Sequence, residues 1–379
     1  MFDPHSIRSL FPALSRTQGG EPVVYLDGPG GTQTPRMVGA AMAAVLDAGV
    51  SNHGGDFVTS HEGEATVSAA RHAVADLINA ADPHEIAFGQ NMTSLTFAVS
   101  RALARTWQPG DEIVVTRLDH DANVTPWVVA AEERGVQVRW LDFLPDEGCR
   151  LDYRSLEDVL DRRTRLVAVT HASNAVGTIV DVDRVVAAAH SVGALVYVDA
   201  VHYSPHGLVD VQNLGCDFLV ASAYKFFGPH VGFVYGRHDL LAGIEAYKVR
   251  PAPSDPPGKW ETGTQSFESL AGVTAAIDYL ASLGGVDESV PRRLALQAGM
   301  GVITEHEHRL TDAFLEAVAR RDFLTIAGPA TTTGRTPTFA LAVDGLSAQE
   351  VQHRLGNQGI FVWAGHYYAV EVMKRLGVL

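Results

Sequence analysis

An acid and an amine follow two short apolar runs in the middle of this 379-residue sequence. Asp199 ends the run LVYVD, and Lys225 comes three residues after the run FLVAS. Apolar runs of this length, bounded by polar residues, predict buried strands, here over residues 195–198 and 218–220. If both strands lie in one parallel sheet, the two side chains meet at its carboxyl edge, where open α/β sheets bind ligands. The spacing therefore predicts a site in which a carboxylate and an amine act together.

These two residue types indicate the chemistry of pyridoxal 5′-phosphate (PLP). A PLP enzyme needs a lysine that forms a Schiff base with the cofactor and an acid that keeps the pyridine nitrogen protonated. The chain has only four lysines, and of these only Lys225 has a predicted strand before it and a glycine turn after it; Lys248, Lys259 and Lys374 lie in polar or loop segments. The alternative is that Asp199 caps a helix and Lys225 is solvated. The pair together favours PLP as the cofactor.

The composition bounds the other possibilities. The length fits a two-domain α/β enzyme, and 46% hydrophobic residues supply an ample core. The net charge of -15 argues against nucleic acid as a partner, because that role needs clustered lysines and arginines. No apolar run is long enough for a membrane span and no basic-apolar leader is visible, so a soluble cytoplasmic protein without a membrane partner is expected. Cys149 and Cys216 make neither a disulfide framework nor a CxxC site, and no metal is predicted.

The segments before the central runs are predicted to form an anion site. Helices are expected over 36–48 and 63–80, and a strand over 86–89 precedes the segment QNMTSLTF. Met92 and Thr93 then stand at a strand-to-helix junction, where the backbone amides of a helix N-terminus bind anions. We assign the PLP phosphate to this junction. The alternative is that Thr93 is a simple N-cap.

Six motifs occur along the chain in one order, and together they resemble the class V aminotransferase and cysteine desulfurase family of fold-type I PLP enzymes. The motifs are YLDGPGG, LDHDANVTPW, HASNAVGT, VYVDA, SAYKFFGP and ETGT. The resemblance implies an α/β fold whose large domain has a mostly parallel central sheet flanked by helices, with a smaller α+β C-terminal domain. The large PLP-binding domain is expected over 22–255, and the small domain over 1–21 and 256–379.

The resemblance also implies roles for individual residues. His120 would stack on the pyridine ring and shuttle protons, beside the catalytic Lys225 and Asp199. The other cofactor contacts would be Asn174 and His202 near the phenolic oxygen, Ser222 and Tyr224 at the phosphate, and Thr264, which would reach the phosphate of the other subunit in a homodimer with shared active sites. The alternatives are a His120 bonded to loop backbone and a Thr264 in an ordinary loop before a helix over 268–281. His53, in SNHGGDF, is either a substrate contact or a surface loop residue.

Two departures from the family pattern bear on the reaction. Desulfurases carry a nucleophilic cysteine in a segment like RTGHHCAMP, and the matching segment here is WAGHYYAVE, with Tyr368 in place of the cysteine and Trp363 in place of the arginine. A persulfide needs a thiolate that reaches the substrate sulfur, so the standard desulfurase mechanism is rejected. The C-terminal end is expected to be short relative to the family. Arg335 is then the candidate for holding a substrate carboxylate, or else a surface loop residue.

The sequence therefore predicts a PLP-dependent enzyme that acts on an amino acid or amine. The preferred reaction is elimination of a β-substituent in the manner of a C–S lyase without a persulfide cysteine, with Tyr368 as a proton donor to the departing group or as a packing residue. An aminotransferase or epimerase is the alternative, because it shares the first steps. A non-catalytic PLP-binding scaffold is the second alternative.

Overall fold

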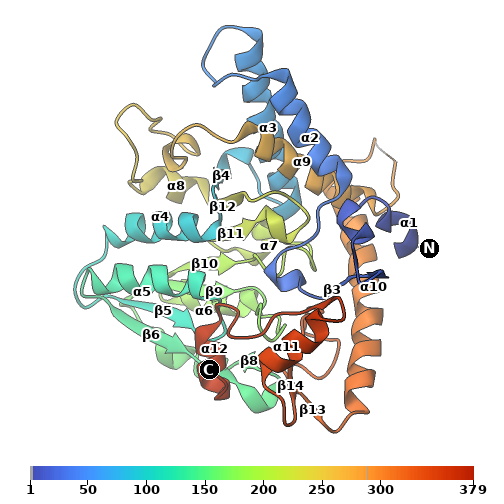
Figure 1. The fold of residues 1–379 in the computed structure, drawn as a ribbon. Helices are drawn as coiled ribbons and strands as arrows, with labels where there is room; N and C mark the ends of the chain where they lie inside the picture. Colours follow the sequence, from blue (N-terminus) through green and yellow to red (C-terminus); the bar gives the residue numbers. More distant parts are fainter. Residues whose placement is uncertain (1–2, 288) are drawn as a thin grey trace.

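A seven-stranded β-sheet forms the centre of the structure, a computed structural model that describes residues 3–287 and 289–379 (Figure 1). Its strand order is β4-β12-β11-β10-β9-β5-β6. In the part of the chain that the structure describes, β12 runs in the opposite direction to the other six strands of this sheet. The strands are β4 (Ile86–Gly89), β5 (Glu112–Thr116), β6 (Gln137–Leu141), β9 (Thr164–Thr170), β10 (Leu195–Asp199), β11 (Phe218–Ser222) and β12 (Gly232–Gly236). The expected α/β fold with a mostly parallel sheet is confirmed, and β10 and β11 are parallel neighbours as predicted.

Both faces of the sheet are buried, which explains why its strands read as continuous apolar runs. In β10, Val196 and Val198 belong to one hydrophobic core, and Tyr197 belongs to the other. The sheet is therefore the middle one of three layers. The helices that cover it are α4 (Met92–Ala104) and α5 (Thr125–Glu132) on the face of Tyr197, and α3 (Val58–Ile78), α6 (Val182–Ser191) and α9 (Phe267–Ser282) on the opposite face.

The C-terminal part of the chain returns to the N-terminal segment. Strand β15 (Ile360–Phe361) pairs in parallel with β3 (Val24–Tyr25), and β13 (Leu324–Ala327) pairs antiparallel with β14 (Ala340–Val343). The long helix α10 (Arg292–Ala319) runs along one side of the molecule toward β13 (Figure 1). The remaining elements are α1 (Pro4–Arg8), α2 (Arg36–Ala48), α7 (Val211–Leu214), α8 (His238–Gly243), α11 (Ala348–Gly356), α12 (Val370–Leu376), β1 (Thr17–Gln18), β2 (Glu21–Pro22), β7 (Phe143–Leu144) and β8 (Arg150–Leu151).

Contacts cross both of the domain boundaries expected from the sequence. Helix α9, which follows residue 255, packs against α2 and α3 and contributes to the same hydrophobic core as the sheet. Strand β3, which follows residue 21, pairs with the C-terminal strand β15. The division into residues 22–255 and the flanking segments stays a prediction. No helix of the described residues is long and apolar enough to cross a membrane.

The helices predicted over 36–48, 63–80 and 268–281 are all present, and the ends of the last two differ from the prediction. Helix α2 covers residues 36–48 as predicted, and α9 extends one residue beyond the prediction at each end. Helix α3 begins at Val58, five residues before the predicted start. The reason is tertiary: the Ser60 hydroxyl accepts from Gly55 N at 2.9 Å and donates to Asn52 O at 2.7 Å, which folds the glycine-rich loop onto the first helical turn.

The first turn of α4 lies against the sheet at Gly232. A Cβ atom on this glycine would lie 2.4 Å from the carbonyl carbon of Asn91 and 2.7 Å from the amide nitrogen of Met92. Backbone atoms cannot give way as a flexible side chain can, so only glycine permits this approach. Ser222, paired with Gly232 in the sheet, accepts a hydrogen bond from Met92 N at 3.0 Å. This contact fixes where the N-terminus of α4 points.

We expect Gly232→Ala to destabilise the protein by about 1 to 3 kcal/mol, because the methyl group pushes the α4 N-terminus away from the sheet. Gly301→Ala in α10 is the matched control, since a Cβ there meets no atom within 4 Å; it is expected to be neutral or to stabilise by up to about 1 kcal/mol. Urea unfolding followed by circular dichroism measures both variants. A Gly232→Ala protein as stable as wild type would contradict the packing described here.

Candidate active site

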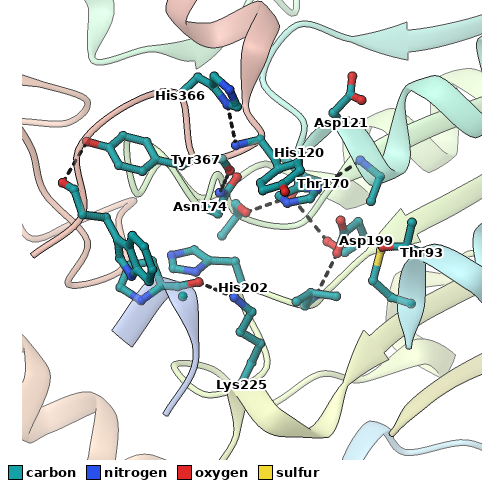
Figure 2. A pocket seen from close by; sticks show the side chains of 18 of the residues that line it. Thr93, His120, Asp121, Thr170, Asn174, Asp199, His202, Lys225, His366 and Tyr367 are labelled. Atoms are coloured by element: carbon teal, nitrogen blue, oxygen red, sulfur yellow. Dashed lines mark hydrogen bonds between the residues drawn. The ribbon is translucent and has the colours of Figure 1, made fainter. Parts of the chain in front are cut away.

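A cavity of about 770 Å³ opens at the carboxyl edge of the sheet beside Asp199 and Lys225 (Figure 2). Its walls come from the segments that follow β5, β9, β10 and β11, from the N-terminus of α4, and from the loop 363–368. The sequence-predicted residues that line it are Met92, Thr93, His120, Asn174, Asp199, His202, Tyr224, Lys225 and Tyr368. Most of the predicted site residues are therefore brought together in one place.

Asp199, which is buried, and Lys225, which is half-buried, are the acid and the amine of this cavity. Asp199 ends β10, and Lys225 lies in the turn after β11. Asp199 Oδ1 accepts a hydrogen bond from Val201 N at 2.9 Å, and Lys225 Nζ donates to the carbonyl oxygen of Pro29. Burial raises the pKa of Asp199 to about 6 and lowers the pKa of Lys225 to about 8, and each charge partly offsets the shift of the other. Near neutral pH the site therefore offers an ionised acid and an amine that readily loses its proton.

His120 lines the cavity with its ring stacked on that of Tyr368, at 5.5 Å between the ring centroids and 17° between the planes. Its Nδ1 accepts a hydrogen bond from Ala122 N at 3.0 Å, so the alternative of a histidine bonded to loop backbone also describes it. Because Nδ1 accepts, the neutral ring carries its proton on Nε2. Burial, with the nearby charge of Lys225, lowers the pKa of His120 to about 4, so the ring is neutral at neutral pH.

The N-terminus of α4 faces the cavity through Met92 and Thr93. The N-cap is Asn91, whose Oδ1 accepts from Ser94 N at 2.9 Å, so the alternative of Thr93 as the cap is wrong. Ser222 does not line the cavity wall, but its hydroxyl contacts the same helix end through Met92 N. The first amides of a helix have no intrahelical partner and attract anions. The arrangement can hold a phosphate group.

Tyr224 forms another part of the wall, next to Lys225 in the chain. Its ring stacks on that of His230 at 4.9 Å between centroids, and Lys225 Nζ lies 4.8 Å from the centre of the Tyr224 ring. Burial raises the pKa of Tyr224 above its usual value, with a further contribution from Asp199. The phenol therefore keeps its proton at neutral pH and can act as a donor.

Asn174 and His202 both contact the C-terminal part of the chain, and Figure 2 shows the contact of Asn174 with Tyr367. Asn174 Nδ2 donates to Tyr367 O at 2.9 Å, while its buried Oδ1 has no partner among the described residues. His202 Nε2 lies 3.1 Å from Thr336 Oγ1 and 2.9 Å from Thr338 Oγ1. Both side chains also line the cavity, so each retains hydrogen-bonding capacity toward a bound molecule.

His53 and Thr264 are exposed and do not line the cavity of their own chain. Asn52 Nδ2 donates to Thr264 Oγ1 at 3.3 Å, so the two loops that carry these residues touch each other. The expected role of Thr264 needs a second subunit, and that of His53 needs a substrate. Both roles stay predictions.

Arg335 is neither a surface residue nor part of the cavity wall. Its buried guanidinium donates to the backbone carbonyl groups of Pro329, Thr336 and Thr338. The interpretation of Arg335 as the ligand of a substrate carboxylate gains no support, because each guanidinium nitrogen already donates to a backbone carbonyl and the side chain does not line the cavity. Within the described chain, no arginine lines the cavity. This burial could not be predicted from the residue pattern, because the carbonyl partners are brought to Arg335 by the fold.

Asp119 is a buried residue of the site that sequence reasoning missed. It accepts hydrogen bonds from Asn123 Nδ2 at 2.7 Å and from the Thr116 hydroxyl. Burial, reinforced by the negative charge of Asp199, raises the pKa of Asp119 to about 8. Asp119 is therefore mostly protonated at neutral pH and does not compete with Asp199 for a positive charge. Its position directly before His120 in LDHDAN was the available signal.

The loop 363–368 closes one side of the cavity through contacts that the sequence did not reveal. Trp363 Nε1 donates to a backbone carbonyl of the N-terminal loop at 3.1 Å, and the Tyr368 carbonyl accepts from Asp121 N at 2.7 Å. Tyr367 and Tyr368 have φ angles of 52° and 58°, a left-handed conformation that side chains other than glycine rarely adopt. Contacts with the N-terminal loop and with Asp121 therefore hold this loop in a strained conformation beside the cavity.

The fold and site define an α/β enzyme whose chemistry centres on a buried lysine and aspartate. The chain belongs to the class V aminotransferase family, whose model (Aminotransferase class-V) matches residues 24–379. It is 33% identical to a cysteine desulfurase of Pectobacterium atrosepticum, over 98% of this chain and 90% of that protein. It is 32% identical to a probable cysteine desulfurase of Streptomyces coelicolor, over 100% of this chain and 91% of that protein.

Solved structures give the same family. The cysteine desulfurase CsdA of Escherichia coli superposes with a TM-score of 0.84 at 27% identity, and the apo cysteine desulfurase of Thermococcus onnurineus NA1 with a TM-score of 0.85 at 27% identity. Each comparison covers 100% of this chain and 92% of the other. Class V aminotransferases and cysteine desulfurases are PLP-dependent enzymes, and the chain is therefore a PLP-dependent lyase or transferase. No cluster of side chains able to hold a metal ion occurs among the described residues.

His171, which follows β9, predicts a pH dependence of stability. Its ring stacks on that of Tyr203 at 3.6 Å between centroids, and burial lowers the pKa of His171 to about 3. A histidine in the unfolded chain titrates near pH 6.5, so below that pH the unfolded state binds a proton that the folded state does not. The stability contributed by this burial is present above about pH 6.5 and is lost as the pH falls toward about 3.

Acidification from about pH 7.5 to about pH 4.5 lowers the free energy of unfolding of wild type. In His171→Phe, which keeps a ring for stacking on Tyr203, we expect this drop to be smaller by about 1 to 3 kcal/mol. His308→Phe, at an exposed position of α10, is the control and is expected to follow wild type. Urea unfolding at the two pH values gives the difference. If wild type and His171→Phe lost equal stability on acidification, His171 would not be buried in its neutral form.

Proposed function

We propose that this protein is a PLP-dependent lyase that eliminates a sulfur-bearing or similar β-substituent from an amino acid, without a persulfide on the enzyme. The observation that carries the proposal is the buried pair of Lys225 and Asp199 on one cavity, following two parallel neighbouring strands. The kinship with cysteine desulfurases supports C–S bond chemistry. The residues at the loop 363–368 support a route that does not use a cysteine.

The residues of the cavity fit PLP. The Met92–Thr93 helix end, with Ser222 and Tyr224, would hold the phosphate, and Asp199 would bond the pyridine nitrogen. Asn174 and His202 would contact the phenolic oxygen. The fit rests on the α4 N-terminus that lines the cavity, on the unpartnered buried Oδ1 of Asn174, and on the lowered pKa of Lys225, which a Schiff base requires. When bound, PLP supplies an electron sink that stabilises negative charge at the substrate α-carbon.

Lys225 is the group that we expect to take the proton from the substrate α-carbon. Burial keeps its pKa near 8, so the neutral amine is available close to neutral pH. His120 is less suited to this task, because its Nδ1 already accepts from Ala122 N and its Nε2 carries the proton. Its neutral ring instead offers a flat face and an N–H donor. We therefore propose Lys225, rather than His120, as the base.

Tyr368 is the residue that we propose as proton donor to the departing group. Its side chain is 67% exposed and its ring stacks on His120, so the phenol lies at the side of the cavity rather than in a core. The two cysteines have the opposite setting: both are buried, neither lines the cavity, and burial raises the pKa of both Cys149 and Cys216, the latter to about 12. A thiol with a raised pKa is a poor nucleophile near neutral pH.

A homodimer with shared active sites is part of the proposal. Large exposed apolar side chains lie on the segments next to Thr264, which indicates a surface that another protein molecule covers. They are Leu46, Phe57, Val58, Tyr247 and Val249. A second copy seated there would bring Thr264 toward the neighbouring cavity. Light scattering at several concentrations tests the dimer, and a monomer at all of them would refute it.

The reaction is tested by incubating the PLP-loaded enzyme with a panel of amino acids and amines. A β-eliminating lyase releases pyruvate or a related oxo acid together with ammonia and the departing group, including sulfide from cysteine. An aminotransferase would instead retain the amino group on the cofactor and produce an oxo acid without ammonia, and an epimerase would change only the configuration. The last two outcomes would each replace the proposed reaction while leaving the cofactor assignment intact.

We expect Asp199→Asn to slow exchange of the substrate α-proton by at least about 100-fold, while PLP affinity falls much less. The carboxylate beside the pyridine nitrogen keeps that nitrogen protonated, whereas cofactor retention depends mainly on the phosphate contacts at Thr93 and Ser222. Proton exchange in deuterated water, followed by NMR, and PLP titration measure the two effects. An unchanged exchange rate in Asp199→Asn would show that Asp199 is not the partner of the pyridine nitrogen.

Replacing both cysteines is predicted to leave turnover intact, because neither thiol can reach the cavity. The comparison sets Cys149→Ser/Cys216→Ser against Tyr368→Phe, which removes only the phenolic hydroxyl and is expected to slow turnover by about 10- to 1000-fold. Mass spectrometry after exposure to cysteine searches for a persulfide on either thiol. A persulfide in wild type, combined with lost turnover in the double serine variant, would restore the standard desulfurase mechanism.

A further inference from the structure

The segment 334–338 is pressed closely against the loop that follows β9. Thr336 N donates to Gly177 O at 2.8 Å, and Ile179 N donates to Gly334 O at 2.9 Å. Gly177 has a φ of 77°, and a Cβ atom there would lie 2.5 Å from the carbonyl oxygen of Thr338. The close approach therefore depends on glycine, and it places two threonine side chains beside the cavity residue His202.

Arg335, a buried residue of this segment, stabilises its backbone. Its guanidinium bonds the carbonyl oxygens of Pro329, Thr336 and Thr338, and its charged end lies 4.3 Å from the centre of the Phe339 ring. Three donors directed to carbonyl groups within ten residues of one another fix the local backbone. The conformation of Thr336 and Thr338 is therefore set without any contact to the cavity.

The hydroxyl hydrogens of the two threonines decide which nitrogen of His202 carries the proton. The Thr336 hydroxyl can donate to Gly177 O at 3.3 Å. The Thr338 hydroxyl is buried, and its single hydrogen-bond partner among the described residues is His202 Nε2, at 2.9 Å. A buried hydroxyl must donate its hydrogen or leave it unsatisfied, so Nε2 accepts and the ring proton sits on Nδ1. Nδ1 makes no hydrogen bond within the described chain, and His202 lines the cavity.

We propose that Thr338, held by Arg335, is a positioning residue that fixes the Nδ1-protonated form of His202, so that His202 donates a hydrogen bond into the cavity. The identity of the acceptor rests on the proposed function, in which it is an oxygen of PLP. The tautomer itself does not depend on the cofactor. The C-terminal part of the chain thereby acts on the cavity through a side chain of the turn that follows β10.

The surroundings keep His202 neutral. Burial is the main cause that holds the pKa of His202 well below its usual value, and the nearby His206, Lys225 and His120 act in the same direction. His206 lies 5.3 Å from His202 between ring centroids and is paired with Glu307 at 2.9 Å. A neutral imidazole with a fixed tautomer donates from one nitrogen and accepts at the other. The donor into the cavity therefore persists at neutral pH.

The tautomer is measured by NMR on the full chain with ¹⁵N-labelled histidine, with and without PLP. The His202 signals are identified by their loss in His202→Gln. The proposal predicts a proton bonded to Nδ1 and an unprotonated Nε2 in both samples of wild type, and a mixture of the two forms in Thr336→Val/Thr338→Val. A proton on Nε2 in wild type overturns the proposal, whatever the protein does with PLP.

The effect on the cofactor is measured by PLP titration of four variants. Thr338→Val keeps the shape but loses the donor, and is expected to weaken PLP binding about fivefold to tenfold. Thr338→Ser restores the hydroxyl and is expected to bind within about twofold of wild type. Thr331→Val, in the same loop without contact to His202, is the matched control, and His202→Leu is expected to lose at least as much as Thr338→Val.

The outcomes separate the two claims. Weak binding by Thr338→Val with rescue by Thr338→Ser supports the positioning role, since a packing defect would not respond to the hydroxyl alone. Equal loss in Thr338→Val and Thr338→Ser, or none in either, overturns the role. If wild type failed to bind PLP, the proposed function would fall, and the NMR result would still decide the tautomer.

Discussion

The burial of Asp199 beside Lys225 constrains the rest of the site. A carboxylate and an amine that leave water lose hydration that their mutual attraction only partly replaces, so each needs further partners. The amide of Val201 supplies one to the acid, and the carbonyl of Pro29 supplies one to the amine. The residual cost is visible in their pKa values, about 6 and about 8, which lie closer together than in water. The small difference between the two pKa values makes the pair chemically useful, because an acid that stays charged lies near an amine that readily loses its proton.

The sheet provides the rigid base for this pair, and glycines bring the other walls close enough to serve it. Gly232 lets the α4 N-terminus approach β12, which sets the direction of the amides of Met92 and Thr93. Gly177 lets the C-terminal segment approach His202. The two contacts use backbone positions that any larger residue would push apart. The walls of the cavity therefore come from segments that lie far apart in the sequence.

Much of the site could be predicted from sequence because its signals are local. The apolar runs before Asp199 and Lys225 predict buried strands. A lysine with a strand before it and a glycine turn after it is also a short-range pattern. Arg335 could not be placed in this way. Its partners are carbonyl groups, which every sequence has, so the difference between a carboxylate ligand and a backbone support exists only in the fold.

Other features were hidden for related physical reasons. The early start of α3 depends on a Ser60 contact with the preceding loop, and the left-handed backbone at Tyr367 and Tyr368 depends on anchoring contacts from distant segments. Residue propensities favour neither outcome. Asp119 is the exception, since it adjoins His120 in the sequence and was overlooked. Long-range contacts therefore decided what the local pattern left open.

The most direct test of the account is the location of the covalent bond to the cofactor. The purified protein is incubated with PLP, reduced with borohydride, digested and mapped by mass spectrometry, with Lys225→Ala as the control. We predict a single pyridoxyl group on Lys225 and none on the variant, because among the four lysines this one combines a cavity position with a pKa lowered by burial. A label on Lys248, Lys259 or Lys374, or no label at all, would contradict the assignment of this cavity as a PLP site.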